Sequence, residues 1–306
     1  MENRLEIDGV SFSFGKKKVL KDITFNVEKG ETYGLVGPDG AGKTTLIRLF
    51  CGLLAPDEGS CSVLGMDSVK DKKNMIKKIG YLSQRFSLYG DLTISENMNF
   101  FAEIHGLRKF QKKKKELLEF MGIEKFSKRR ADRLSGGMKQ KLALACTLIH
   151  TPEIIFLDEP TNGVDPVARR EFWKILKTVS DDGVSVVIST PYLDEAGKCD
   201  KVCFMNEGSI IEKGAPAELK NKFNGTIAEI VTQNSRSNFE IVRKINGVSS
   251  VQLFGDKMHA VFNESVITEE KLKENIAKIS DFKRFRVVEP TMEDVFISLL
   301  EGKAND

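Results

Sequence analysis

The heptapeptide LSGGMKQ at residues 134–140 lies downstream of GPDGAGKTT at 37–45 and shortly before IIFLDEP at 154–160. The upstream segment is a glycine-rich turn of the kind that holds phosphate. The heptapeptide is a second glycine-rich element that can begin a helix, and the downstream segment is an apolar strand that ends in two carboxylates. In this order, the three segments predict two anion-binding elements and one metal site.

The turn at residues 37–45 matches the GxxxxGK[ST] pattern, which follows an apolar strand and opens a helix. We expect Gly37, Gly40 and Gly42 to allow turn conformations that a residue with a Cβ would resist. Lys43 would supply positive charge to the β- and γ-phosphates, and Thr44 would place its hydroxyl on Mg²⁺. The expected nucleotide contacts in this loop are Gly37, Pro38, Asp39, Gly40, Ala41, Gly42, Lys43, Thr44 and Thr45.

The acidic pair follows four apolar residues, 154–157, that do not alternate with polar ones. Such a run is typical of a strand buried on both faces. Asp158 and Glu159 would therefore lie at the carboxyl end of that strand, where ligands bind in open α/β sheets. Without the phosphate loop, an acidic loop on the surface would be the better interpretation. Because the phosphate loop is present, we expect both carboxylates to face it.

Ser135 can cap a helix whose apolar face spans residues 142–149 at helical spacing. Gly136 and Gly137 would let the first amides of this helix approach a ligand closely. A helix start of this kind binds anions. Residues 135–137 are therefore expected nucleotide contacts.

Together, these segments resemble the ATP-binding subunits of ABC transporters, and the resemblance is dense over residues 5–217. It implies ATP and Mg²⁺ as cofactors and ATP hydrolysis as the activity. Asp158 would hold Mg²⁺ through water, and Glu159 would polarise the attacking water as general base. Residues 134–140 would contact the γ-phosphate held by a second cassette, of the same or a different chain, in a head-to-tail dimer.

Other positions acquire roles through the same resemblance. Gln84 resembles the glutamine that touches Mg²⁺ and the attacking water. Phe14 resembles the aromatic residue that stacks on adenine, since stacking needs only a π-face, whereas Phe12 is expected in the core. Residues 164–166 resemble the loop that contacts the partner's phosphate site.

Two positions depart from the family pattern. Asp39 stands where asparagine is more common, and Pro191 stands where most of the family carries a histidine that contacts the γ-phosphate. Proline offers neither an imidazole nor a backbone donor. Either hydrolysis proceeds on Glu159 with a weaker clamp, or the chain pairs with a different ATPase subunit; intact Lys43 and Asp158 favour slow hydrolysis.

Composition sets outer limits. The 306 residues are 30% charged with a net charge of only +3, so no nucleic-acid partner is expected. Five cysteines without a CxxC pair are typical of a reduced, cytosolic protein. A polar start and the lack of an apolar run of ~18 residues predict no signal peptide and no spanning helix. We expect a cytoplasmic protein, peripheral on the inner face of the membrane, with a separate integral membrane permease.

The fold class follows from the order of patterns. Alternation over residues 5–27 predicts an N-terminal antiparallel β subdomain, residues 86–150 read as an inserted helical subdomain, and residues 154–211 complete an α/β P-loop core. Beyond Gly225, a βαββαβ succession predicts a small ferredoxin-like α+β domain. The expected domains are the ATP-binding cassette at 1–222 and an accessory domain at 223–306.

The tail motif MEDVF at residues 292–296 resembles ATPase subunits of drug and polysaccharide exporters. We therefore expect a subunit that powers an ABC exporter by ATP-driven cassette dimerisation, with membrane contacts at 85–89 and 95–101. A soluble ABC ATPase acting on ribosomes or DNA is the alternative, but the chain has neither a second cassette nor a long coiled-coil insertion. A further alternative is a nucleotide-dependent regulator that does not hydrolyse ATP; Pro191 favours this interpretation and Glu159 argues against it. An importer subunit is also possible, but the MEDVF tail favours export.

Overall fold

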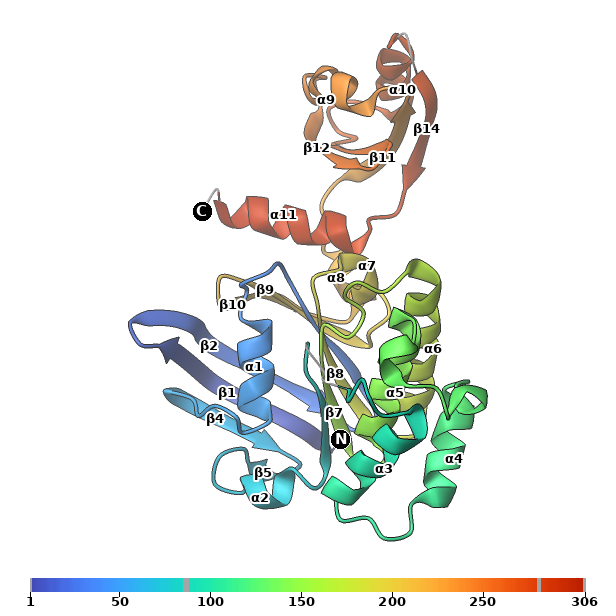
Figure 1. The fold of residues 1–306 in the computed structure, drawn as a ribbon. Helices are drawn as coiled ribbons and strands as arrows, with labels where there is room; N and C mark the ends of the chain where they lie inside the picture. Colours follow the sequence, from blue (N-terminus) through green and yellow to red (C-terminus); the bar gives the residue numbers. More distant parts are fainter. Residues whose placement is uncertain (1, 85–87, 280–281, 305–306) are drawn as a thin grey trace. The chain divides into compact units, whose positions relative to one another are not determined.

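The computed structural model describes residues 2–84, 88–279 and 282–304. The chain divides into two units, Met1–Pro216 and Ala217–Asp306. This division lies after Pro216, the first residue of the helix α8 (Pro216–Asn221), and the cassette boundary expected after residue 222 stays a prediction. Figure 1 shows the elements of both units.

A six-stranded sheet forms the centre of the first unit, with the strand order β10-β9-β3-β8-β7-β6. All neighbouring pairs are parallel except β9 and β10. Every residue of β3, β7 and β8 is buried, as the uninterrupted apolar runs predict for strands covered on both faces. The bounds are β3 Thr32–Val36, β6 Ile79–Leu82, β7 Ile154–Asp158, β8 Ser185–Thr190, β9 Lys201–Asn206 and β10 Ser209–Gly214.

A second, antiparallel sheet with the order β2-β1-β4-β5 confirms the N-terminal β subdomain. The strands β1 (Asn3–Phe14) and β2 (Lys17–Glu28) match the expectation, whereas β4 (Glu58–Val63) and the short β5 (Met66–Asp67) lay outside it. The helix α1 (Lys43–Phe50) packs against β2 and β4 on one side and β7 on the other. One apolar core is therefore shared by both sheets and α1, and Figure 1 shows where these elements lie in the unit.

The inserted helical subdomain is also confirmed. Its helices α3 (Ile94–Ile104) and α4 (Gln111–Phe120) both pack against α5 (Gly136–Leu148), which packs against the sheet edge at β6. Thr93 and Glu96 form a capping box that fixes the start of α3. The other helical elements of this unit are α2 Lys72–Met75, η1 Glu124–Phe126, η2 Ala131–Arg133, α6 Pro166–Asp181 and α7 Leu193–Ala196.

The second unit has the predicted βαββαβ succession in an antiparallel sheet of order β12-β13-β11-β14. Two helices contribute to its core on one face, and a final helix, α11, was not anticipated from the sequence. The bounds are β11 Thr226–Thr232, α9 Ser235–Arg243, β12 Val248–Phe254, β13 Lys257–Phe262, α10 Glu269–Ala277, β14 Phe282–Val288 and α11 Met292–Ala304.

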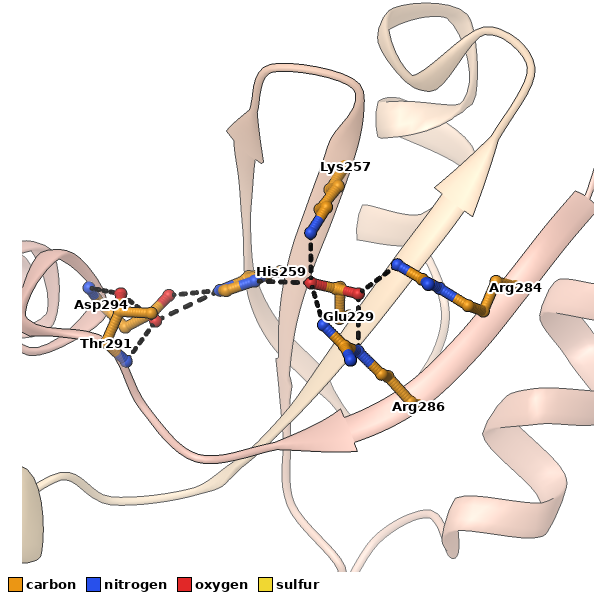
Figure 2. Close-up of polar contacts among 7 residues, drawn as sticks. All are labelled: Glu229, Lys257, His259, Arg284, Arg286, Thr291 and Asp294. Carbon is orange, nitrogen blue, oxygen red and sulfur yellow. Dashed lines mark hydrogen bonds and ion pairs between the residues drawn. The ribbon is translucent and has the colours of Figure 1, made fainter. Parts of the chain in front are cut away.

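A charged network spans three strands of this unit (Figure 2). Glu229 on β11 is only 3% exposed, yet its carboxylate accepts hydrogen bonds from Lys257 (3.0 Å), Arg284 (3.0 Å) and Arg286 (2.7 and 3.0 Å). The hydrogen bonds from Arg286 foremost, with Lys257, lower the pKa of Glu229 to about 2, against burial, which would raise it. A buried carboxylate is thus kept ionised by cations from the neighbouring strands.

The network explains one residue of the MEDVF motif. Asp294 accepts a hydrogen bond from His259 Nδ1 (3.0 Å) and forms a capping box with Thr291 at the start of α11. Burial would raise the pKa of Asp294, but the hydrogen bonds from His259 and Thr291 prevail and lower it. Asp294 therefore ties the final helix to the sheet of its own unit, as Figure 2 shows.

Candidate active site

The site forms where neighbouring strands of the central sheet end. The glycine-rich loop follows β3, Gln84 follows β6, and Asp158 is the last residue of β7. These strands run parallel, so their carboxyl ends meet at one edge. This topology brings together side chains that lie far apart in the sequence.

The loop glycines serve two different purposes. Gly40 (φ 81°) and Gly42 (φ 102°) adopt the left-handed backbone predicted for them. Gly37 also excludes a Cβ, but for a different reason: its φ is not positive, and a Cβ there would collide with the backbone carbonyl of Met205. Gly37 is required by close packing of the loop against β9.

Lys43 lies within the loop that precedes it. Its ammonium donates hydrogen bonds to the carbonyl oxygens of Gly37 (2.8 Å) and Pro38 (2.9 Å) and lies 3.5 Å from Glu159 Oε1. The side chain is only 3% exposed. A buried cation held chiefly by neutral carbonyls can bind a phosphate without breaking a strong ion pair.

Thr44 and Asp158 converge on one point. The Thr44 hydroxyl donates to Asp158 Oδ1 over 3.0 Å, and Ser189 donates to the same oxygen over 2.7 Å. Hydroxyl and carboxylate oxygens beside a phosphate loop are the ligand set that suits Mg²⁺. The residues present therefore fit the expected metal.

Glu159 is held in an uncommon backbone conformation, with φ 48°. Its N–H donates to the hydroxyl (2.9 Å) and carbonyl (3.2 Å) of Ser189, and its Oε2 accepts from Gln84 Nε2 over 2.8 Å. Strain of this kind persists where surrounding contacts over-determine it, and it gathers at functional sites. The structure thus brings Gln84, Lys43 and Glu159 together.

A cavity of about 410 Å³ opens over the loop. The sequence analysis did not predict four of its lining residues, Lys17, Lys18, Val19 and Glu207. The run of lysines after Phe14 was a signal that could have indicated two of them. Phe14 itself is 50% exposed at the end of β1, does not line the cavity, and packs edge-on against buried Phe12. The lining residues are Lys17, Lys18, Val19, Gly40, Ala41, Gly42, Lys43, Thr44, Thr45, Glu159 and Glu207.

The LSGG residues lie apart from this cavity within the chain. Ser135 caps α5 as predicted, accepting a hydrogen bond from Met138 N over 3.4 Å. A Cβ on Gly136 would meet open space, whereas one on Gly137 would lie 2.6 Å from the Ala168 side chain. Gly136 thus leaves the helix start accessible, while Gly137 allows α5 and α6 to pack closely.

Residues 20–162 match the ABC transporter family, and residues 214–300 match the C-terminal domain of DrrA1-3-like ATP-binding proteins. The linearmycin resistance ATP-binding protein LnrL of Bacillus subtilis (strain 168) is 31% identical over 96% of this chain and 97% of its own length. The chain belongs to the ABC transporter ATP-binding proteins. The resemblance to subunits with a C-terminal extension is confirmed.

Other ABC transporter proteins agree. The probable multidrug ABC transporter ATP-binding protein YbhF of Escherichia coli (strain K12) is 38% identical over 94% of this chain, which spans only 50% of that relative. A solved ATP-binding subunit of an ABC transporter is 28% identical, with a TM-score of 0.65 over 72% of this chain and 92% of that one. CbiO1 from Clostridium perfringens, described as part of an ABC transporter complex, is 28% identical, with a TM-score of 0.67 over 72% of this chain and 92% of that one. These likenesses confirm the P-loop fold class.

In the described part of the chain, no helix combines the length and the apolar character needed to cross a membrane.

All five cysteines are buried and free. Burial raises the pKa of the Cys203 thiol to about 12, which keeps it protonated and unreactive at neutral pH.

Proposed function

We propose that this ABC protein binds ATP with Mg²⁺, hydrolyses it, and thereby powers an exporter. The observation that carries the proposal is the convergence of Lys43, Thr44, Asp158, Glu159 and Gln84 on one edge of the sheet. The names of relatives as drug-resistance and multidrug ATP-binding proteins support export.

The loop residues would bind and orient the nucleotide. The Lys43 ammonium would exchange its bonds to two loop carbonyls for the β- and γ-phosphates. Thr44 and Asp158, whose oxygens lie 3.0 Å apart, would hold Mg²⁺, Asp158 through water. Bound Mg²⁺ neutralises charge that develops on the transferred phosphoryl group.

Glu159 would accept the proton of the attacking water. Gln84 donates to its Oε2, which leaves Oε1 toward Lys43 and the phosphate loop. Phosphoryl transfer requires mainly positioning and charge stabilisation, and a single oriented carboxylate suits that task.

A second cassette would complete the site. Ser135 and Gly136 present an accessible helix start that lies outside the cavity of their own chain. We therefore assign residues 135–137 and 164–166 to the γ-phosphate held by a partner cassette, whether identical or different. ATP binding would close two cassettes against each other, and hydrolysis would reopen them.

A membrane permease would dock beside Gln84. Of the two expected contact segments, residues 85–87 lie outside the described residues. Tyr89 is 48% exposed, packs edge-on against Phe100 (4.4 Å between ring centroids), and has its backbone held by buried Asn97. Rigid exposed aromatic side chains suit such an interface, and docking there would place the protein on the inner face of the membrane. Co-purification with an integral membrane protein separates this reading from a soluble one.

A binding-only regulator is the second candidate, and Pro191 is the observation that favours it. A binding-only regulator would bind ATP tightly and show no ATP turnover.

The test is ATP-dependent dimerisation measured by light scattering. We expect Glu159→Gln with Mg²⁺ and ATP to accumulate as a closed dimer, because nucleotide is bound but not cleaved. Lys43→Met keeps the side-chain volume, loses the charge, and should stay monomeric. A Glu159→Gln chain that remains monomeric at saturating ATP, alone and with its permease, contradicts the proposal.

A further inference from the structure

The residue after Pro191 reaches toward the proposed general base. The Tyr192 hydroxyl donates to Asn162 Oδ1 over 3.4 Å, and Asn162 Nδ2 donates to Glu159 Oε2 over 3.3 Å. Glu159 Oε2 is the same oxygen that accepts from Gln84. A phenol, an amide and a carboxylate therefore form one line that ends at Glu159.

Tyr192 is held by contacts on both its backbone and its ring. Its N–H donates to Thr190 Oγ1 over 3.0 Å, and the guanidinium carbon of Arg169 lies 4.9 Å from the ring centroid. Arg169 is itself fixed by Asp194 over 3.0 Å. Stacking of a guanidinium on tyrosine is attractive and orients the ring, so the direction of the phenol is set by its surroundings.

A buried network sets the distance between the segment that contains Asn162 and the segment that contains Tyr192. The fully buried Glu195 carboxylate accepts from Thr161 (2.9 Å) and from Thr190 (2.7 Å). Thr161 adjoins Asn162, and Thr190 lies two residues before Tyr192. Buried hydrogen-bonded networks rigidify the elements that they join. The approach of Tyr192 to Asn162 is therefore built into the fold.

The phenol determines how the Asn162 amide is turned. An asparagine side chain has one accepting and one donating end. With Oδ1 engaged by the Tyr192 hydroxyl, Nδ2 must face Glu159; without the phenol the amide can rotate and present its oxygen to the carboxylate. We infer that Tyr192 is a positioning residue for Glu159, acting through Asn162, at the place where Pro191 offers no donor. The inference rests on the proposed role of Glu159.

The experiment is steady-state ATP hydrolysis by the full chain with Tyr192→Phe. This change removes one oxygen and retains the ring that Arg169 stacks on. We expect kcat to fall about three- to tenfold, as for the loss of one hydrogen bond, with the KM for ATP and the Tm unchanged. A loss of packing would move the Tm, and a loss of nucleotide binding would move the KM; either pattern overturns the inference.

A double-mutant cycle separates positioning through Asn162 from an independent effect. Asn162→Ala should lower kcat at least as much as Tyr192→Phe, and the double variant should be no slower than Asn162→Ala alone. Additive losses overturn the inference. Glu159→Gln is measured alongside: turnover that depends on Glu159 but not on Tyr192 overturns this inference alone, whereas absence of Glu159-dependent turnover overturns it together with the proposed function.

Discussion

Pro191 is the single residue that most limits the expected rate of hydrolysis. It follows β8 directly, beside the strand end that carries Asp158, and it offers no donor to a phosphate. We predict that Pro191→His raises kcat several-fold, because an imidazole N–H near the γ-phosphate would stabilise charge in the transition state. Steady-state phosphate release checks this; a kcat that is unchanged or lower contradicts it.

The residues of the site show what sequence reasoning can reach. The positions of Lys43 and Asp158 follow from motif spacing, because that spacing places Lys43 after the loop that follows β3 and Asp158 at the end of β7. The reason for Gly37 could not be found, since the carbonyl that it avoids belongs to Met205 on a distant strand. Lys17 reaches the cavity from the start of β2 and Glu207 from the turn between β9 and β10, and no local pattern predicts that these segments approach the phosphate loop.

At the scale of elements, the packing of α5 against α6 depends on one glycine. We predict that Gly137→Ala lowers the free energy of unfolding by about 1–3 kcal/mol, because its Cβ would lie 2.6 Å from the Ala168 side chain. Gly136→Ala is the matched control, since its Cβ meets no atom within 4 Å and alanine favours the helix. Urea unfolding measures both, and equal stabilities would refute the packing argument.

A second element-scale prediction concerns His150, two residues after the end of α5. His150 Nε2 lies 2.9 Å from the Ile79 carbonyl, which can only accept, so Nε2 carries the proton; Nδ1 is buried without a hydrogen-bond partner in the described structure. Burial, and next the stacked ring of His105, lower the pKa of His150 to about 4 from 6.5. Protonation therefore favours the unfolded chain.

The free energy of unfolding should consequently fall as the pH drops from 6.5 toward about 4, and should be insensitive to His150 above 6.5. His150→Gln, which can still donate to the Ile79 carbonyl, should lose most of this pH dependence. Urea titrations at pH 7 and pH 5 test the claim; an identical pH dependence in the parent chain and the variant would contradict it.

The fold was more predictable than its accessory elements. The helical insertion within residues 86–150 and the βαββαβ succession follow from local periodicity. In contrast, β4 and β5 exist through pairing with β1 and with each other, which is a tertiary effect. The helix α11 begins with a capping box, and the Asp294 of that box also accepts a hydrogen bond from His259 on β13. The MEDVF motif could therefore be recognised in the sequence, but the helix that it begins could not be predicted from it.

At the scale of the whole molecule, the charged network of the second unit sets an acid limit on stability. The pKa of Glu229 is lowered from 4.5 to about 2, so its contribution is fully present above 4.5 and is lost as the pH falls toward 2. Glu229→Gln should cost about 2 kcal/mol at pH 7, the scale of hydrogen bonds to a charged group. Hydrogen exchange of β11 amides measures this; protection equal to that of the parent chain would show that the network does not stabilise its unit.

The central claim is that Glu159, at the end of a buried strand beside the phosphate loop, makes the chain an ATPase. Mg²⁺-dependent phosphate release by the purified full chain, compared with Glu159→Gln, tests it most directly. We predict turnover that requires Mg²⁺ and falls at least about 100-fold in the variant, as expected for the loss of a general base. Tight ATP binding without turnover in the parent chain, alone and with its membrane partner, would contradict the account.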